Sequence, residues 1–424
     1  MIHNILLYSC LILEFLLVLI LPAFGYSQEI TSFGQFFCGI GLGVILLHKF
    51  YNREAENVKV SDKRFSIYIP LAISALFLLA LWPLKLQLGN IFVAYPIDAN
   101  ISDIIPTIRV AVERFMSGEQ VYKEVHFKEG WSLASVGYLP MQWLPFCIAD
   151  IFKKDYRFIA FAIWTAATLL IIFRAAKNRI SDGIVIATLC LYMLWLLVNY
   201  QSTLLGTTVE LLIAGYYIFL IVGLNQKNPY LKAASIVLCM LSRYSLVLWL
   251  PLWLLVEWFS GDRKAAIISC LTITAAVLII YIIPFLSQDW GTFFRVFKNY
   301  DKAALGEWQH INPATGKPYH LYNGSGFAYL YYEYLNWDMP MRIKALQRSH
   351  LILSLLSVAI CGLWYFMNRK RMQVYQIFLL GSFKIYLTFF LMFIQVPYTY
   401  LIMVGCFVSL AIVAEQTKYR LKAN

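Results

Sequence analysis

The sequence predicts an all-α, polytopic integral membrane protein with about twelve transmembrane helices and two long extracytoplasmic loops. Of its 424 residues, 60% are hydrophobic and only 14% are charged, and the mean hydropathy is +0.66. A soluble chain carries roughly 25% charged residues. One apolar segment after another is long enough to cross a bilayer as a helix. Alternating segments of about ten residues, which are typical of membrane barrels, are absent from the sequence.

The candidate spans lie near residues 5–24, 33–50, 66–84, 156–173, 180–198, 204–224, 265–286, 349–367, 375–394 and 397–415. The segment 231–259 is too long for one ordinary span and is interrupted by Arg243 and Pro251, so we predict two shorter spans that turn near Arg243–Tyr244. Residues 139–152 are too few to cross and contain two prolines, which favours a re-entrant or surface-lying helix. Glu14 interrupts the first apolar run, so we expect residues 5–24 to be an uncleaved span.

The net charge of +12 arises mainly from the loops on one side of these spans. That side receives Lys49, Arg53, Lys59, Lys63, Arg64, Arg174, Lys177, Arg179, Lys227, Lys232, Arg263, Lys264, Arg369, Lys370, Arg371, Lys418, Arg420 and Lys422. The short loops 25–32, 199–203 and 395–396 contain no Lys or Arg. Basic loops mark the cytoplasmic face, which predicts a multi-pass protein of the cell membrane with both termini in the cytoplasm. The loops 85–138 and 287–348 then face outward, and nucleic acid is not an expected partner.

The cysteines and histidines predict no cofactor. All eight cysteines lie in or beside apolar stretches, no pair has C-x-x-C spacing, and the six histidines include no H-x-x-x-H pair. We therefore expect neither a disulfide framework nor a zinc site, while a divalent metal remains open.

The spacing of apolar residues in the first outer loop predicts an amphipathic helix over residues 103–117. Its apolar side chains recur at helical spacing and are Ile104, Ile105, Ile108, Val112, Phe115 and Met116. Arg109 and Glu113 lie on the opposite face, so the helix should lie flat on the outer leaflet. Asp103 is a favoured residue type for the helix N-cap. It is also our first candidate for a general base that takes a proton from an attacking hydroxyl. Asp98 is the rival base, and its alternative role is that of a solvated loop charge.

A carboxylate just outside a span, a flat helix after it and a second loop able to close over it suit a substrate that is half lipid and half sugar phosphate. Arg243 interrupts an apolar region, where a charged side chain is costly and marks a functional site by default. A guanidinium there can hold a lipid phosphate. The alternative is a structural ion pair with Glu210 or Glu257.

These segments resemble a known family. Ser102-Asp103, Gly118-Glu119-Gln120-Val121-Tyr122, Tyr138-Leu139-Pro140 and Pro145 look like the first outer loop of GT-C glycosyltransferases. More narrowly, they are similar to the polyprenyl-phosphate-mannose-dependent mannosyltransferases of glycosyltransferase family 87. Further matches are Gln201 after a span, Arg243 where relatives often have Lys, and Asn323-Gly324-Ser325 where relatives show Asn-Gln-Ser. The resemblance covers residues 65–415, which leaves 1–50 as an N-terminal helical hairpin addition and 416–424 as a cytoplasmic tail.

Three positions depart from the family pattern. Leu139 replaces the first proline of Tyr-Pro-Pro, Thr203 stands where relatives often have Asn, and Gln395-Val396-Pro397-Tyr398 replaces a His-rich motif. They leave the donor sugar open, with mannose as one candidate.

The resemblance implies an inverting transfer of a monosaccharide from a polyprenyl-phosphate donor to a lipid-linked or glycan acceptor in cell-envelope glycan biosynthesis. Asp103 or Asp98 would act as the catalytic base. Arg243, Gln201, Asn323 and Tyr138 would contact the donor or its phosphate. His310, His320 and Trp308 are candidates for sugar or phosphate contacts, although the loop aromatics can equally form a small core of their own. Membrane lipids are the remaining expected partners.

Two other functions fit the composition. A secondary transporter or lipid flippase also has many spans and buried charges, but its site usually lies at mid-membrane between two similar halves, which the sequence does not show. A non-catalytic scaffold for envelope assembly would leave Asp103 and Arg243 individually dispensable.

Overall fold

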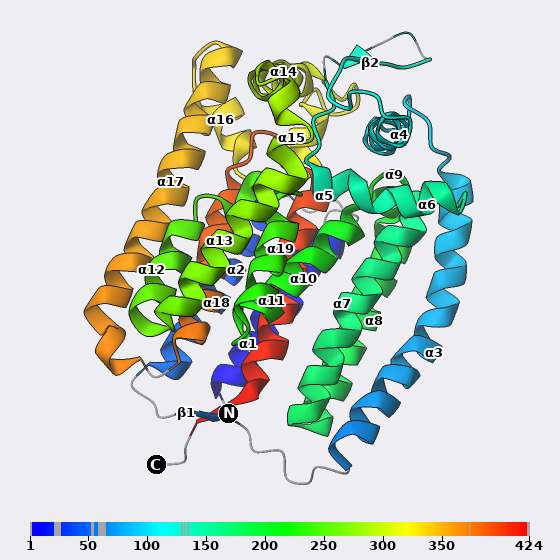
Figure 1. Ribbon diagram of the computed structural model, residues 1–424. Helices are drawn as coiled ribbons and strands as arrows, with labels where there is room; N and C mark the ends of the chain where they lie inside the picture. Colours follow the sequence, from blue (N-terminus) through cyan, green and yellow to red (C-terminus); the bar gives the residue numbers. More distant parts are fainter. Residues whose placement is uncertain are drawn as a thin grey trace.

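A computed structural model describes residues 2–20, 27–51, 55–57, 65–128, 130, 132–133, 135–372 and 374–421 (Figure 1). Parts of the predicted loop 25–32, of the basic segment 52–64 and of the tail 416–424 lie outside these residues. The described chain is almost entirely helical, which confirms the predicted all-α class.

Nine helical segments of the described residues are long and apolar enough to cross a membrane. They comprise α1 (Ile2–Phe15) continued by η1 (Leu16–Ile20), α2 (Gln28–Phe50), α3 (Phe65–Ala94), α7 (Tyr156–Asn178), α8 (Ile180–Tyr200), α13 (Arg263–Val277) continued by η5 (Leu278–Ile282), α17 (Met339–Asn368) continued by η7 (Arg369–Arg371), α18 (Tyr375–Met392), and α19 (Thr399–Glu415) continued by η8 (Gln416–Lys418). They pack side by side as a bundle.

Three shorter apolar helices occupy the remaining predicted spans: α10 (Glu210–Leu224), α11 (Pro229–Met240) and α12 (Leu250–Ser260). The predicted break near Arg243 is confirmed, because the chain leaves α11 at Leu241 and only the single turn η4 (Tyr244–Leu246) precedes α12. The prediction of one span over 204–224 was wrong. The short α9 (Ser202–Thr207) ends within this range, and α10 begins after it at Glu210. The Thr208 hydroxyl accepts from the Glu210 amide at 3.3 Å at this break.

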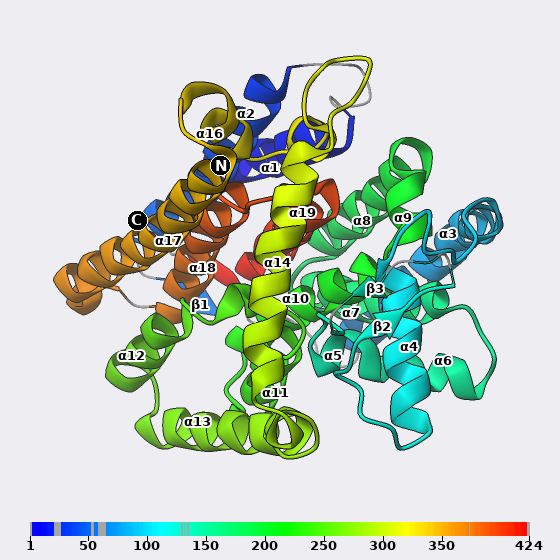
Figure 2. The same cartoon turned by 90° about the horizontal axis from the view of Figure 1, so that it is seen from above.

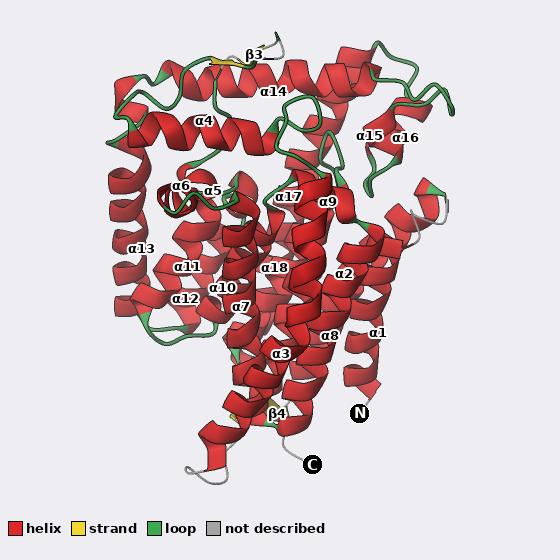
Figure 3. Ribbon diagram, turned by 90° about the vertical axis from the view of Figure 1, so that its right-hand side faces the viewer, coloured by secondary structure: helices red, strands yellow, loops and turns green. Residues whose placement is uncertain are grey.

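Two helices lie flat across one end of the bundle, which we call the loop-bearing end. They are α4 (Ile104–Met116) and α14 (Gly291–Gln309), and both run across the bundle axis (Figures 2 and 3). The predicted helix 103–117 is thus confirmed, but its apolar face packs against protein, and Phe115 and Met116 remain 40% and 48% exposed. Residues 139–152 form α5 (Pro140–Trp143), η3 (Leu144–Phe146) and α6 (Cys147–Ile151), none long enough to cross, as predicted.

The two outer loops are shorter than predicted. Helix α3 continues to Ala94 rather than ending near residue 84, and α17 begins at Met339 rather than near residue 349. Hydropathy locates only the apolar part of a helix, and these helices extend beyond it. The second loop also contains η6 (Leu286–Gln288), α15 (Tyr319–Tyr322) and α16 (Ala328–Tyr334).

Two small antiparallel strand pairs lie at opposite ends of the molecule. Strands β2 (Val125–His126) and β3 (Ser132–Leu133) pair within the first loop. Strand β1 (Ala55–Asn57), which follows α2, pairs with β4 (Tyr419–Leu421), which follows α19. Figure 1 shows β1 and both chain ends at the end of the bundle opposite α4 and α14.

The hairpin α1–α2 packs against α18 and α19 and shares the main apolar core of the bundle. Its carboxylate Glu14 lies 2.7 Å from the Lys384 ammonium of α18, and both side chains are buried. Inside the bundle the charge of each therefore compensates the other. The hairpin therefore packs as part of the same bundle, and its origin as an N-terminal addition stays a prediction.

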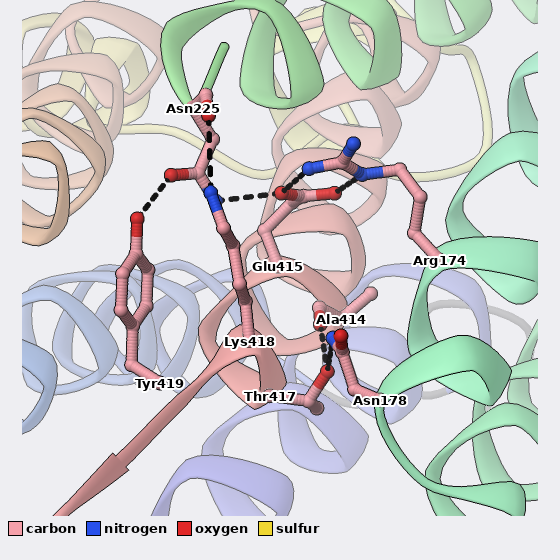
Figure 4. Close-up of polar contacts among 8 residues, drawn as sticks. All are labelled: Arg174, Asn178, Asn225, Ala414, Glu415, Thr417, Lys418 and Tyr419. Carbon is pink, nitrogen blue, oxygen red and sulfur yellow. Dashed lines mark hydrogen bonds and ion pairs between the residues drawn. The ribbon is translucent and has the colours of Figure 1, made fainter. Parts of the chain in front are cut away.

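A second buried carboxylate ties three helices together at the end of the bundle opposite α14 (Figure 4). The Arg174 guanidinium of α7 makes a two-point ion pair with Glu415 of α19, and the Asn225 amide at the end of α10 donates to the same carboxylate at 2.6 Å. The Tyr419 hydroxyl then donates to the side-chain oxygen Oδ1 of Asn225. The contacts fix the end of α19 before the chain enters β4.

Glu415→Gln is expected to destabilise the fold by about 3 kcal/mol, because Arg174 loses its charge partner in a mostly buried site. Thermal unfolding in detergent measures the effect as a lower midpoint. Lys177→Gln, which changes an exposed charge on the same helix as Arg174, is the matched control and should leave the midpoint unchanged. Equal midpoints for the two variants would contradict a stabilising role for this carboxylate.

Candidate functional site

Side chains from distant parts of the sequence meet beneath α14 at the loop-bearing end. We call them the polar cluster: Asp103, Tyr138, Glu210, Arg243, Tyr300, Glu307, Tyr398 and Tyr400. Electrostatic interactions link these groups across the cluster. The charges of Asp103, Glu210 and Arg243 interact electrostatically with the Tyr138 hydroxyl, and the charge of Arg243 also interacts with the Tyr300 hydroxyl of α14. Three predicted site residues, Asp103, Tyr138 and Arg243, are thus brought together.

Asp103 stands at the N-cap of α4 without capping it. Its side chain accepts no hydrogen bond from the first turn, and the hydroxyl of Ser102 accepts from the Ile104 amide at 3.4 Å instead. The half-buried carboxylate interacts with Glu307 of α14. Burial raises the pKa of Asp103 above its ordinary value and the charge of Glu307 adds to the rise, while the residue's own backbone amide opposes it. A higher pKa makes the ionised carboxylate a stronger proton acceptor.

Asp98, the rival base, is used by the backbone. Its Oδ1 accepts from the Asn100 amide at 2.8 Å, and its carbonyl accepts from the amides of Ile101 and Ser102. These bonds form the turn that leads from α3 into α4. A structural role in the loop, rather than that of catalytic base, therefore suits Asp98 better than it suits Asp103.

Arg243 forms an ion pair with Glu210, which starts α10. The pair confirms one of the two predicted partners, whereas Glu257 pairs with Lys232 instead. Arg243 is not sequestered by this contact, because 18% of its side chain is exposed and its Nε, although buried, has no hydrogen-bond partner among the described residues. Its guanidinium carbon lies 6.0 Å from the ring centroid of Tyr400. Among the described residues, its Nε–H therefore remains available to an anion.

Backbone contacts place Arg243 directly below the first outer loop. The Met141 amide of α5 donates to the Leu241 carbonyl at 2.8 Å, and the Tyr216 hydroxyl of α10 donates to the Met141 carbonyl at 3.1 Å. Tyr138 lies three residues before Met141, and its carbonyl accepts from the Tyr122 hydroxyl at 3.0 Å. The start of α5 is therefore fastened to the break after α11, which sets Tyr138 beside Arg243.

The second loop contributes Glu307, on the last turn of α14. Its two carboxylate oxygens accept from the Tyr398 hydroxyl, at 3.0 Å, and from the His320 ring. Burial opposes ionisation of Glu307, but the hydrogen bonds from His320 and Tyr398, together with electrostatic attraction to His320 and His310, outweigh it and hold the pKa of the carboxyl below its ordinary value. His310 lies beside them, and one ligand atom from each of Glu307, His310 and His320 falls within 4.8 Å of the others.

Trp308, one of the predicted sugar or phosphate contacts, has a fully buried side chain. It lies in a small core of the second loop with Leu321, Ala328, Ile343 and Leu346, and its Nε1 donates to the Gln395 carbonyl at 2.9 Å. A ring with no exposed face cannot stack on a sugar. The alternative that loop aromatics form their own core is correct for this residue.

Asn323 is exposed at the end of α15, next to the turn between α18 and α19. Its carbonyl accepts from the Thr399 hydroxyl at 3.2 Å. The following residue must be glycine, because a Cβ at Gly324 would lie 1.6 Å from the carbonyl oxygen of Pro397. This close approach brings the second loop onto the segment that carries Tyr398 and Tyr400.

Gln201 lies at the end of α8, and its amide donates to the Leu19 carbonyl at 3.3 Å. This contact is with the N-terminal hairpin, and no contact described for Gln201 reaches the polar cluster. Its predicted role in donor binding stays a prediction.

Sequence reasoning did not single out Tyr300, Glu307 or Tyr400. The one local signal was the spacing of Glu307 and His310, which places both on neighbouring positions at the end of a helix. Arg157 was also missed. It is buried, pairs with Asp155 and donates to the carbonyls of Phe92, Tyr95 and Gly206, so it braces the start of the first outer loop.

An open, largely apolar groove of about 690 Å³ runs between α3 and α7. Its lining includes Leu78, Phe158 and Leu169, and also Lys85, whose ammonium lies 4.6 Å from the Trp82 ring. It contains no residue of the polar cluster. The groove is therefore a separate feature from the site.

No family model, curated protein or solved structure matches this chain.

Proposed function

We propose that this chain is an integral membrane glycosyltransferase that moves a monosaccharide from a polyprenyl-phosphate donor to a lipid-linked or glycan acceptor on the extracytoplasmic side. One observation favours it above the others. A carboxylate left unused by the helix it precedes and a guanidinium with unused donors belong to the same polar cluster, beneath a helix that lies across the bundle end. A base and an anion-binding group are the two functions that this reaction requires.

The chemistry needs little else. The acceptor hydroxyl oxygen attacks the anomeric carbon, and the bond between that carbon and the phosphate oxygen breaks. Polyprenyl phosphate leaves with the bonding electrons, and the hydroxyl proton passes to Asp103. Arg243 stabilises the charge on the departing phosphate through donors that Glu210 does not occupy. The Tyr138 hydroxyl interacts electrostatically with both groups and can orient the sugar.

The proposed topology has twelve spans, with both termini in the cytoplasm. The three shorter apolar helices complete the count, and the pairing of β1 with β4 places the chain after α2 and the chain after α19 at the same bundle end. The basic residues Arg174, Arg369 and Lys418 belong to helix ends at that side. The positive-inside rule then makes the loop-bearing end extracytoplasmic.

Cysteines introduced singly at residues 120–128 and 305–320 of a cysteine-free variant should react with an impermeant maleimide added to intact cells. Those introduced at 368–371 should react only after the cells are opened. If residues 231–259 formed one span instead of two, an odd number of spans would precede residues 368–371 and this loop would face outward. Labelling of 368–371 from outside would therefore contradict the two-span arrangement of α11 and α12.

Lipid analysis tests the function directly. Cells that lack the chain should accumulate a polyprenyl-phosphate sugar, and the wild-type chain should remove it while Asp103→Asn should not. Western blotting of the membrane fraction shows whether both proteins are present in equal amounts. Unchanged lipids in cells without the chain would contradict the proposal.

The alternative, a transporter or flippase, needs free polar groups inside the bundle. The charges there pair with each other among the described residues, Glu14 with Lys384 and Lys232 with Glu257, which favours the enzyme. Purified protein in detergent separates the two functions, since transfer between soluble micelle components needs no sealed compartment whereas transport does. Activity that appears only in sealed vesicles would favour the transporter.

A further inference from the structure

The two histidines of the second outer loop lie beside a carboxylate, and the chain is folded so as to bring them there. Glu307 and His310 are three residues apart at the end of α14, so they project from adjacent positions of the last turn. His310 is the residue at which the chain leaves the helix. These two side chains are thus neighbours by helix geometry alone.

A tight reversal of the chain adds His320. The Asn312 carbonyl accepts from the amides of Thr315 and Gly316, and Gly316 adopts a φ of +67°, which glycine tolerates best. Beyond the turn, the Lys317 carbonyl accepts from the Asn312 amide at 2.8 Å, and the Tyr319 amide donates to the His310 carbonyl at 2.9 Å. Residues 310 and 319 are therefore bonded to each other, and His320 follows directly.

We infer that Glu307, His310 and His320 form a binding site for one divalent transition-metal ion of the zinc type. Two imidazole nitrogens and one carboxylate oxygen are ligands that Zn²⁺ prefers, and three protein ligands leave a further position for water or another oxygen. Ligand atoms around a tetrahedral zinc ion lie about 3.3 Å apart, since the bonds are about 2.0–2.1 Å long. The three atoms already lie within 4.8 Å of one another, so closure needs only small side-chain rotations.

The surroundings of the three residues fit a metal ligand set. The Tyr398 hydroxyl holds one oxygen of Glu307 at 3.0 Å and leaves the other, which now contacts His320, to face the group. Outer partners of this kind orient metal-binding carboxylates. His310 is exposed and His320 half-buried, which leaves a path for an ion to enter.

The test is metal titration of the full-length protein, purified in detergent with a histidine-free affinity tag and stripped with a chelator. Wild-type protein should bind one Zn²⁺ per chain in calorimetry. It should also give a visible absorption spectrum with Co²⁺ that Zn²⁺ abolishes. His310→Asn and His320→Asn should each weaken Zn²⁺ binding by more than about 100-fold, and Tyr398→Phe by about 10- to 100-fold, since it removes only an outer partner.

Two other histidines provide the matched controls. His126→Asn changes an exposed histidine of the first loop, and His48→Asn breaks the pair in which His3 and His48 lie 3.0 Å apart. Both variants should bind Zn²⁺ like the wild type. Because His310 is exposed, its substitution should not alter the elution volume or melting temperature of the metal-free protein.

Absence of stoichiometric binding, or wild-type affinity in His310→Asn, would reduce the group to a hydrogen-bonded Glu–His pair and overturn the inference. Loss of binding in His48→Asn alone would assign the metal to the other end of the molecule and overturn it equally. The titration measures metal binding and not glycosyl transfer, so its outcome is independent of the proposed enzyme activity.

Discussion

Asp103→Asn is expected to lower the rate of sugar transfer by about two to four orders of magnitude while leaving the fold intact. The substitution keeps the size of the side chain and removes its ability to accept a proton, which is what general base catalysis contributes. Stability should hardly change, because Asp103 makes no capping hydrogen bond to α4 and the Ser102 hydroxyl serves that purpose. The rate is measured with purified protein and a radiolabelled polyprenyl-phosphate sugar, and the fold by thermal unfolding.

Two variants make this result specific. Glu113→Gln removes an exposed carboxylate from the same helix and should leave the rate within about twofold of the wild type, since it alters no group of the polar cluster. Asp98→Asn should lower stability modestly, because its carboxylate helps to form the turn before α4. Full activity of Asp103→Asn would pass the role of base to Asp98. Full activity of both variants would remove the enzyme proposal.

Arg243→Ala is expected to lower the transfer rate by about 100- to 1000-fold, the usual loss when a donor to a developing negative charge is removed. Arg243→Lys should retain part of the activity, because the charge survives while the planar pair of donors is lost. The assay is the same radiolabelled transfer, and the apparent affinity for the donor lipid should fall in both variants.

The alanine variant also leaves Glu210 buried beside no cation, which costs stability. A double variant, Arg243→Ala with Glu210→Gln, separates the two effects because it removes the orphaned charge. It should recover the melting temperature and remain inactive. Recovery of activity together with stability would show that Arg243 is a structural partner of Glu210 and not a ligand of the phosphate.

The sequence predicted the arrangement of helices well where a single physical rule governs it. Apolar length located the long helices, and the break at Arg243 followed from the cost of a charge inside an apolar run. The break at Thr208 was missed because threonine is apolar enough to pass within a hydropathy window. Only its hydrogen bonds, to Leu204 and from Glu210, show that the helix ends there.

The site was predictable in part. Asp103 and Arg243 were found because each departs from its surroundings, as a carboxylate before a helix or a cation in an apolar run, and Tyr138 came from the family resemblance. Glu307 and Tyr400 look ordinary in the sequence. Their place in the polar cluster depends on how α14 crosses the bundle and how Gly324 packs on Pro397, and no local pattern encodes those contacts. Trp308 was misassigned because composition cannot separate a loop's core from its surface.

Helix α19 comes after all the other helices in the chain, yet every residue from Ile402 to Glu415 is buried among helices α1, α7, α10 and α18. During biosynthesis its neighbours are therefore inserted first and must remain separable until it arrives. A segment enclosed in this way gains little from contact with lipid and depends on protein partners for its final position. Mutations that weaken α19 should therefore act at the stage of membrane insertion and quality control, reducing the amount of protein rather than its rate per molecule.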